Sequence, residues 1–269
     1  MTVVVALLVA LLLVAVPVLV VVVAFARLRR GPADPAPAGD GPPVVCLGAS
    51  TIQGTVSFNV VADLARRLPQ FGFVNAGVNG NTSTQVLARL AAVLARTPRF
   101  VIVHVGANDV LAIHGGAASD AVAAAKWDGL EANLRAIVRG LSAAGARVGL
   151  MSLQPVGEQL GSALNQRVDR ANEIIRRTAD AEGVGYLPLH ERLAEVIATD
   201  GTGRAVPDSL AMVARAVVLH LGLGVSLDRI GRRNGFVVHS DGLHLASRGG
   251  RIAADLIESF IETEVHSDP

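Results

Sequence analysis

The sequence predicts an α/β domain with a five-stranded parallel sheet, preceded by one N-terminal transmembrane helix. Two observations carry this prediction. Hydrophobic residues make up 51% of the 269-residue chain, aromatic residues 3% and charged residues 17%, a balance too apolar for an ordinary soluble domain. From residue 44 onward, short apolar runs alternate with longer segments of helical period, which is typical of parallel strands joined by crossover helices.

The apolar excess is concentrated in residues 3–26, which hold no charged or hydrogen-bonding side chain. At ~1.5 Å per residue, a helix over this stretch is roughly 36 Å long and could cross a hydrocarbon layer of ~30 Å. A cleaved signal peptide is the alternative, because Ala24 and Ala26 give the small-x-small form of a cleavage site. The apolar stretch is long for a signal peptide and no basic residue precedes it, so an uncleaved single-pass anchor is expected.

The charges beside this segment predict its orientation. Arg27, Arg29 and Arg30 follow it, and the positive-inside rule then places the rest of the chain on the cytoplasmic side of the membrane. A cleaved signal would place it on the extracytoplasmic side instead. Residues 31–43 contain five prolines and predict an extended linker that reaches up to ~40 Å at ~3.1 Å per residue.

Five strands and several helices are expected after the linker. The expected strands cover residues 44–48, 73–76, 100–105, 147–152 and 184–188. Apolar residues recur at helical spacing within 60–68, 127–141 and 252–260, so these segments are expected to be helices that pack on the sheet.

The segment 199–236 does not fit this alternation, and it contains a long apolar stretch at 210–227. Arg215, His220 and two glycines interrupt the stretch, so a second membrane crossing is disfavoured and a helix packed on the domain is expected. A lid or an acyl-chain surface near a functional site is the alternative.

Charge and cysteine content exclude several classes of function. The net charge is +1, from 24 basic and 23 acidic residues, so no strong field would gather nucleic acid and no nucleic-acid partner is expected. Cys46 is the only cysteine, which excludes a disulfide framework and a multi-cysteine metal site. The sequence has no H-E-x-x-H motif, and neither a metal nor another cofactor is expected.

Polar residues follow the expected strands, at the edge of a parallel sheet where ligands bind. Residues 48–54 follow the first strand, 75–82 the second and 106–109 the third, while 241–244 precede the last helix. Together they supply the Ser50 hydroxyl, the His244 imidazole, a carboxylate three residues before it at Asp241, and two donors for an oxyanion. These are the groups that serine acyl transfer requires.

These four segments resemble the motifs of the SGNH or GDSL-type hydrolases, a superfamily of esterases and lipases. The likeness runs from residue 44 to about 261 and implies a three-layer, flavodoxin-like fold. It implies a catalytic triad of Ser50, His244 and Asp241, in which histidine is the base and aspartate orients it. It also implies an oxyanion hole formed by the N–H groups of Ser50 and Gly80 and the side-chain amide of Asn108.

Composition and the family likeness together divide the chain into parts. Residues 1–30 are expected to be the anchor with its basic flank, 31–43 the linker, 44–264 the SGNH hydrolase-type catalytic domain and 265–269 a C-terminal tail. Two positions depart from the G-D-S-L signature, since Ala49 replaces its aspartate and Thr51 its leucine. Both lie in the loop that carries the nucleophile, so they bear on how that loop is supported. Ile52 stands where the G-x-S-x-G elbow of α/β-hydrolases has its second glycine, which disfavours that fold.

The expected function is that of a serine esterase or lipase, which hydrolyses a carboxylic ester through an acyl-enzyme. The apolar segments favour a lipid or lysophospholipid ester, and a short acetyl ester on a sugar is the alternative. An O-acyltransferase with the same residues and an inactive, membrane-tethered binding module are the rival functions. Outside the motifs, His104 is expected in the core, and Asp109 as a brace for the loop of Asn108. His239 is expected at a strand end or in a loop, with contact to substrate as the alternative.

Overall fold

The sheet contains the five predicted strands, all parallel, in the order β2-β1-β3-β4-β5. The strands are β1 (Pro43–Gly48), β2 (Gly72–Gly77), β3 (Phe100–His104), β4 (Arg147–Met151) and β5 (Gly185–Leu187). Each observed end lies within one residue of its predicted end. The order is that of flavodoxin-like folds. In this computed structural model the described residues are 2–31, 41–116, 119–206 and 211–266, with the side chains of the first helix described from residue 15 on.

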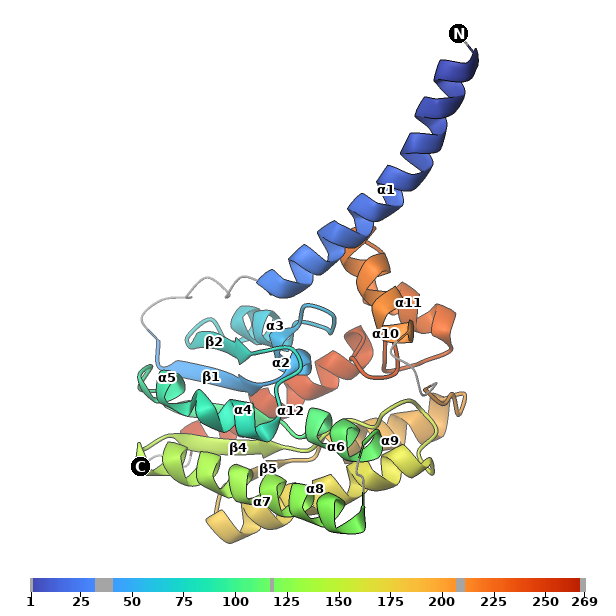
Figure 1. Cartoon of the computed structure of the whole chain (residues 1–269). Coiled ribbons are helices and arrows are strands. Elements are labelled where there is room, and N and C mark those ends of the chain that lie inside the picture. Colours follow the sequence, from blue (N-terminus) through green and yellow to red (C-terminus); the bar gives the residue numbers. More distant parts are fainter. Residues whose placement is uncertain (1, 32–40, 117–118, 207–210, 267–269) are drawn as a thin grey trace.

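Helices cover both faces of the sheet and make the predicted three layers (Figure 1). Val45 and Leu47 of β1 point into one core cluster, while Val44 and Cys46 point into the other. The first cluster is closed by α4 (Ser83–Ala88), α5 (Leu90–Leu94), α6 (Ala107–His114), α7 (Asp120–Ala143) and α8 (Ala163–Glu182). The second is closed by α3 (Val60–Arg67), α9 (Leu189–Asp200) and α12 (Ser247–His266). Because both faces of β1 and β3 are buried, these central strands are nearly continuous apolar runs in the sequence.

The segment 199–236 packs as helices, as expected for its default interpretation. It forms α10 (Ala211–Val217), the π-helix η1 (Val218–Gly222) and α11 (Leu227–Asn234). Its partner is the first helix, α1 (Thr2–Arg30), which Figure 1 shows beside α10. Ala24 and Val217 share a small buried cluster, and Arg27 Nη1 donates to the Leu221 carbonyl at 2.7 Å. This contact between distant segments was not predicted.

The predicted membrane anchor is not supported by the structure. Helix α1 is 29 residues long, and its side chains before residue 15 lie outside the described part. Among the described residues, no helix has both the length and the apolar character that a membrane crossing needs. The predicted linker falls mainly on 32–40, and the predicted tail ends at 267–269; both stretches lie outside the described residues.

Candidate active site

The nucleophile candidate opens a short helix directly after β1. The chain turns at Ala49 into α2 (Ser50–Gln53), and the Gln53 N–H donates to the Ala49 carbonyl at 2.9 Å. This helix lies tightly against β2, because a Cβ at Gly77 would be only 2.2 Å from the Gln53 nitrogen. Gly54 ends the helix at φ 72°, in the left-handed region that glycine adopts without strain. Gly77, which lets α2 approach β2 closely, and Gly54, which ends the helix, therefore permit the position of Ser50.

The loop before α12 holds the predicted base and its carboxylate. His239 and Leu245 form an antiparallel bridge, so the residues between them make a tight turn. One carboxylate oxygen of Asp241, Oδ1, accepts the backbone N–H groups of Leu243 at 3.0 Å and His244 at 2.8 Å. The turn is thus bonded to its own aspartate, which leaves the second carboxylate oxygen for the His244 ring.

The structure brings the three predicted triad residues into one hydrogen-bonded chain. His244 Nδ1 lies 2.8 Å from Asp241 Oδ2, and His244 Nε2 lies 3.0 Å from Ser50 Oγ. An ionised carboxylate only accepts, so Nδ1 carries the ring proton and Nε2 accepts from the serine hydroxyl. Asp241 is 0% exposed and His244 4%, while Ser50 is partly exposed. Substrate therefore has access to the serine while the other two groups are shielded from water.

Electrostatics keep the Asp241 carboxyl ionised. Burial alone would raise the pKa of Asp241, but the nearby His244 ring and hydrogen bonds from that ring and from the turn N–H groups outweigh it. The net result is a pKa below the usual value for aspartate. The carboxylate is thus charged at neutral pH and can stabilise a positive charge on the imidazole.

The predicted oxyanion donor Asn108 lies in the first turn of α6 and shares a small cavity with Ser50. This cavity has a volume of about 10 Å³, and its other described lining residues are Ala49, Thr51, His104, Val105, Ala107, Leu153, Gln154 and Leu243. Asn108 Nδ2 donates one N–H to the Asn81 carbonyl at 2.9 Å. None of the described lining residues comes from 199–236, so the lid alternative receives no support from this cavity.

Gly80, the second predicted donor, lies in the loop next to Asn81 and has φ 76°. It is not among the described residues that line the cavity, so its role stays a prediction. The loop is held to the nucleophile strand by Arg89, whose Nε donates to Asn81 Oδ1 at 2.9 Å and whose Nη2 donates to the Gly48 carbonyl at 2.8 Å.

The interpretation of Asp109 as a loop brace is confirmed. Its carboxylate accepts the Ser83 N–H at 2.9 Å and the Ser83 hydroxyl at 2.7 Å, which ties the start of α6 to the start of α4. Burial raises the pKa of Asp109. The core position expected for His104 is also confirmed, since its ring is buried beneath the cavity.

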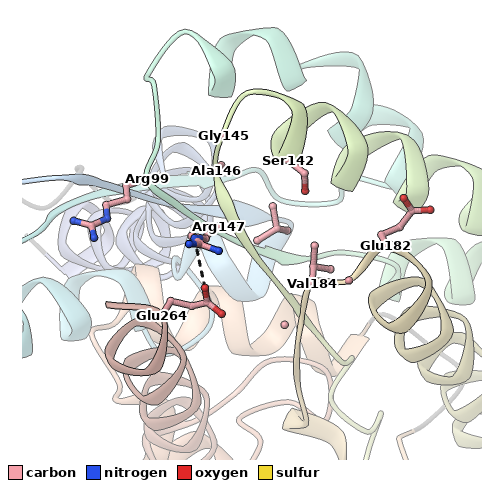
Figure 2. A pocket seen from close by; sticks show the side chains of 11 residues that line it. Arg99, Ser142, Gly145, Ala146, Arg147, Glu182, Val184 and Glu264 are labelled. Atoms are coloured by element: carbon pink, nitrogen blue, oxygen red, sulfur yellow. Dashed lines mark ion pairs between the residues drawn. The ribbon is translucent and has the colours of Figure 1, made fainter. Parts of the chain in front are cut away.

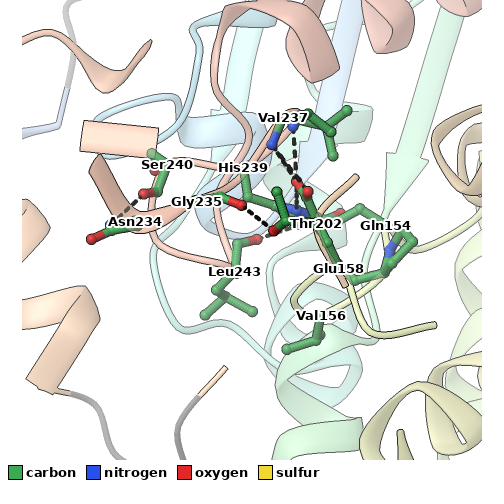
Figure 3. A network of polar contacts seen from close by, with 12 residues as sticks. Gln154, Val156, Glu158, Thr202, Asn234, Gly235, Val237, His239, Ser240 and Leu243 are labelled. Atoms are coloured by element: carbon green, nitrogen blue, oxygen red, sulfur yellow. Dashed lines mark hydrogen bonds and ion pairs between the residues drawn. The ribbon is translucent and has the colours of Figure 1, made fainter. Parts of the chain in front are cut away.

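A buried polar network behind the base was not predicted (Figure 3). Glu158 Oε1 accepts the N–H groups of Val237 at 2.8 Å and Val238 at 2.9 Å, and it lies 3.3 Å from His239 Nδ1. The other ring nitrogen of His239 lies 2.9 Å from the Pro155 carbonyl, so the ring bridges the Glu158 carboxylate and a backbone carbonyl. His239 is thus in a loop, as expected, but it anchors that loop rather than lining the cavity.

This network favours the ionised form of the Glu158 carboxyl. Burial alone would raise the pKa of Glu158, but hydrogen bonds from His239 and from two backbone N–H groups, with the charge of the ring, hold it below its usual value. The only sequence signal was a glutamate in a mostly apolar segment after the fourth strand.

The structure shows no candidate metal site: the described residues contain no group of three or more His, Cys, Asp or Glu side chains placed to hold an ion.

A larger hollow lies at the opposite edge of the sheet, where β3, β4 and β5 begin. It has a volume of about 630 Å³ and is lined by Arg99, Arg147, Glu182 and Glu264 among others. Figure 2 shows Arg147 and Glu264 facing each other there, with Arg147 Nε 3.7 Å from Glu264 Oε2. We call it the amino-end groove; no sequence motif pointed to it.

Comparison with known proteins gives one family and one fold. The sequence pattern of the GDSL-like Lipase/Acylhydrolase family matches residues 46–249. Esterase TesA of Pseudomonas aeruginosa is 35% identical over 113 residues, which are 40% of this chain and 48% of TesA. The chain thus aligns with about half the length of that curated relative.

Solved structures of similar fold cover most of the chain at low identity. The acetyl xylan esterase AlAXEase has a TM-score of 0.57 and 20% identity, over 81% of this chain and 98% of its own. Axe2, an acetylxylan esterase from Geobacillus stearothermophilus, has a TM-score of 0.59 and 18% identity, over 84% and 96%. The hydrolase LAE5 from the metagenome of Lake Arreo has a TM-score of 0.60 and 16% identity, over 86% and 98%. These likenesses support the three-layer sheet architecture.

Proposed function

The chain belongs to the GDSL-like lipase/acylhydrolase family, and on that premise we propose that it hydrolyses a carboxylic ester with Ser50 as nucleophile. The observation that carries this proposal is the hydrogen-bonded chain from Ser50 Oγ to His244 Nε2, at 3.0 Å, and from His244 Nδ1 to Asp241, at 2.8 Å. A hydroxyl beside an oriented imidazole is the arrangement that activates serine.

The chemistry proceeds in two halves. Ser50 Oγ attacks the carbonyl carbon while its proton moves to His244 Nε2, and Asp241 stabilises the resulting imidazolium. His244 then gives the proton to the alcohol oxygen, the C–O bond breaks, and the acyl group stays on Ser50. Water attacks that ester with His244 again taking the proton, and the carboxylic acid is released as the proton returns to Ser50.

The developing negative oxygen needs donors fixed in advance. An amide has two N–H bonds, and Asn108 directs one to Asn81, which fixes the side chain and leaves the second for an oxyanion. The Ser50 N–H belongs to the first turn of a helix, where backbone N–H groups have no intrahelical partner. With the Gly80 N–H these are the proposed oxyanion donors, and each is worth about 2.7–4 kcal/mol in the transition state.

We propose a short acyl group, acetyl above all, rather than a fatty acyl chain. The cavity beside Ser50 and Asn108 measures about 10 Å³. Room for one water-sized group requires about 10–15 Å³, so this cavity favours the smallest acyl groups, and a long chain does not fit in it without movement of the walls. Two of the solved structures with this fold carry the name acetyl xylan esterase, which agrees with a small acyl pocket.

A series of p-nitrophenyl esters from acetyl to palmitoyl tests both parts of the proposal. We expect kcat/KM to be highest for acetyl and to fall by at least about tenfold at octanoyl, because a misfit of a few methylenes costs about 1–3 kcal/mol. Ser50→Ala, purified and folded, should show no turnover. Activity that rises with chain length would contradict the short acyl pocket, and turnover by Ser50→Ala would contradict the nucleophile.

The compartment is a separate proposal that rests on the sequence. If the apolar segment crosses a membrane, the three arginines that follow it place the domain on the cytoplasmic side. Carbonate extraction of membranes should then leave the chain in the pellet, and protease added to sealed right-side-out vesicles should spare the domain. Release by carbonate would exclude the anchor, and digestion in sealed vesicles would place the domain on the other side.

A further inference from the structure

Gln154 connects the loop of the nucleophile to the loop of the base from beneath the cavity. Its Nε2 donates to Thr51 Oγ1 at 2.9 Å and to the Leu243 carbonyl at 3.0 Å. Thr51 directly follows Ser50, and Leu243 directly precedes His244. One side chain, 3% exposed, thus bonds to the immediate neighbour of each reacting residue.

Chemistry fixes the orientation of this amide. The Leu243 carbonyl can only accept, so the nitrogen end of Gln154 must face it. The oxygen end then faces His104 Nε2 at 2.8 Å, and the ring must donate from that nitrogen. His104 is buried, and burial lowers its pKa, so the ring is neutral with its one proton on Nε2. Both N–H bonds and the oxygen of Gln154 are therefore used.

We propose that Gln154 is a positioning residue that sets the distance between Ser50 Oγ and His244 Nε2. This inference rests on the proposed function. It also accounts for a departure from the G-D-S-L signature, because threonine at position 51 supplies a hydroxyl acceptor that leucine lacks. Thr51 and Gln154 form a matched pair, and His104 holds the amide so that both of its N–H bonds point at the catalytic loops.

The expected effect follows from the geometry of proton transfer. An error of about 1 Å between reacting groups costs on the order of 100-fold in rate. Gln154→Met keeps the length of the side chain and removes all three hydrogen bonds. We expect kcat for p-nitrophenyl acetate to fall by about 10- to 100-fold while KM changes by less than about threefold, because the Ser50–His244 contact is disturbed and the acyl pocket is not rebuilt.

The pair with Thr51 separates positioning from general stability. Thr51→Val keeps the shape and removes the acceptor, and we expect kcat to fall by about 3- to 10-fold with KM unchanged. If the two residues act as one unit, the double variant should be about as slow as Gln154→Met alone. If the kcat losses of the two single variants multiply in the double variant, the two residues act independently and the proposal is overturned. Thr51→Val also provides the test if Gln154→Met does not fold.

Activity is expressed per competent site, counted by complete labelling with a fluorophosphonate, at a temperature where circular dichroism shows each variant folded. Gln166→Met is the matched control, since Gln166 is exposed on α8 and away from the cavity. A Gln154→Met variant with lowered thermal stability but wild-type kcat per site would overturn the positioning role. Absence of both labelling and turnover in the wild-type chain would instead overturn the proposed function, so the two failures are distinguishable.

Discussion

The two edges of the sheet carry hollows of very different size, and the smaller one holds the candidate chemistry. The amino-end groove measures about 630 Å³, whereas the cavity beside Ser50 measures about 10 Å³. The nucleophile and the amide donor line the cavity, and the base lies 3.0 Å from the nucleophile, so three separate segments converge there. In the groove, the side chains of Arg147 and Glu264 face each other at 3.7 Å. The arrangement of groups with complementary roles, and not volume, marks the functional site.

The difference between the two edges has a physical origin. At the carboxyl ends of the strands, Asp241 closes its own turn, while Arg89 and Gln154 bond separate loops to one another. Such bonds are shielded from water and gain strength from the low local dielectric. In the groove, Arg147 is 49% exposed, and an exposed ion pair contributes little to stability.

The largest effect of the contrast between the two sheet edges is expected for Asp241→Asn, at the edge that holds the cavity. An asparagine at this position can donate to the ring, which favours the wrong tautomer of His244, and we expect kcat to fall by about 10⁴-fold. Asp169→Asn is a matched control, because Asp169 Oδ1 also lies 3.1 Å from a histidine nitrogen, His190 Nε2, away from the cavity. Steady-state kinetics with p-nitrophenyl acetate decide, and a loss below tenfold in Asp241→Asn would contradict the triad.

Asn108→Ala should produce the next largest effect. Removal of one oxyanion donor costs about 10²- to 10³-fold in turnover and leaves KM nearly unchanged. Asn133→Ala is the control, since Asn133 donates to Ser83 and Thr84 hydroxyls on α4 and does not line the cavity. If the loss appeared only in KM, Asn108 would bind substrate rather than stabilise the transition state.

Glu158→Gln should change stability in a pH-dependent way. The network holds the pKa of Glu158 below its usual value, so the carboxylate stabilises the fold fully above about pH 4.3, the value in an unfolded chain. This contribution is lost as the pH falls through the lower folded pKa. At pH 7 the variant should lose about 3 kcal/mol of unfolding free energy, because an amide NH2 then faces the buried Val237 N–H in place of Oε2 and the negative charge beside His239 is removed.

Urea unfolding at pH 7 and at pH 3.5 measures this change. The difference between wild type and Glu158→Gln should shrink at the lower pH, because the unfolded wild-type chain takes up a proton at Glu158 there and the folded state loses that advantage. A difference that is equal at both values would show that the charge of Glu158 is not what stabilises the loop of the base.

The smallest effect is expected in the amino-end groove. Arg147→Gln removes the charge that faces Glu264, and such a surface pair is worth about 0–1 kcal/mol. We expect stability to change within that range and kcat/KM to equal that of the wild type. A large loss of esterase activity in this variant would show that the groove takes part in function and would remove the contrast between the two edges.

The sequence predicted the five strands and the helices within 60–68, 127–141 and 252–260, but it did not single out α8 and α9. Most strands are short apolar runs, and the D-x-x-H turn is closed by Asp241 itself. Both features can therefore be recognised from a few neighbouring residues. The very short helices α2 and α5 were not predicted, because four or five residues do not display a helical period. The π-helical form of residues 218–222 was not predicted either, since five residues show no distinguishing period.

Outside the family motifs, features that depend on distant contacts could not be predicted. Glu158 and Val237 are 79 positions apart, and Gln154 and Thr51 are 103 apart. Nothing in a single sequence connects such pairs, and a buried glutamate or glutamine has no local pattern of its own. For the same reason the contact of Ala24 with Val217 was missed, although each stretch was recognised as apolar.

The most direct test of the central claim is mass spectrometry of the full chain after reaction with a fluorophosphonate. The serine oxygen displaces fluoride from phosphorus only when a base takes its proton, so labelling reports the Ser50–His244 contact without any knowledge of the substrate. We predict one adduct on the peptide that contains Ser50, and labelling slowed by at least about 10³-fold in His244→Ala. An adduct on another residue, or equally fast labelling of His244→Ala, would contradict the account.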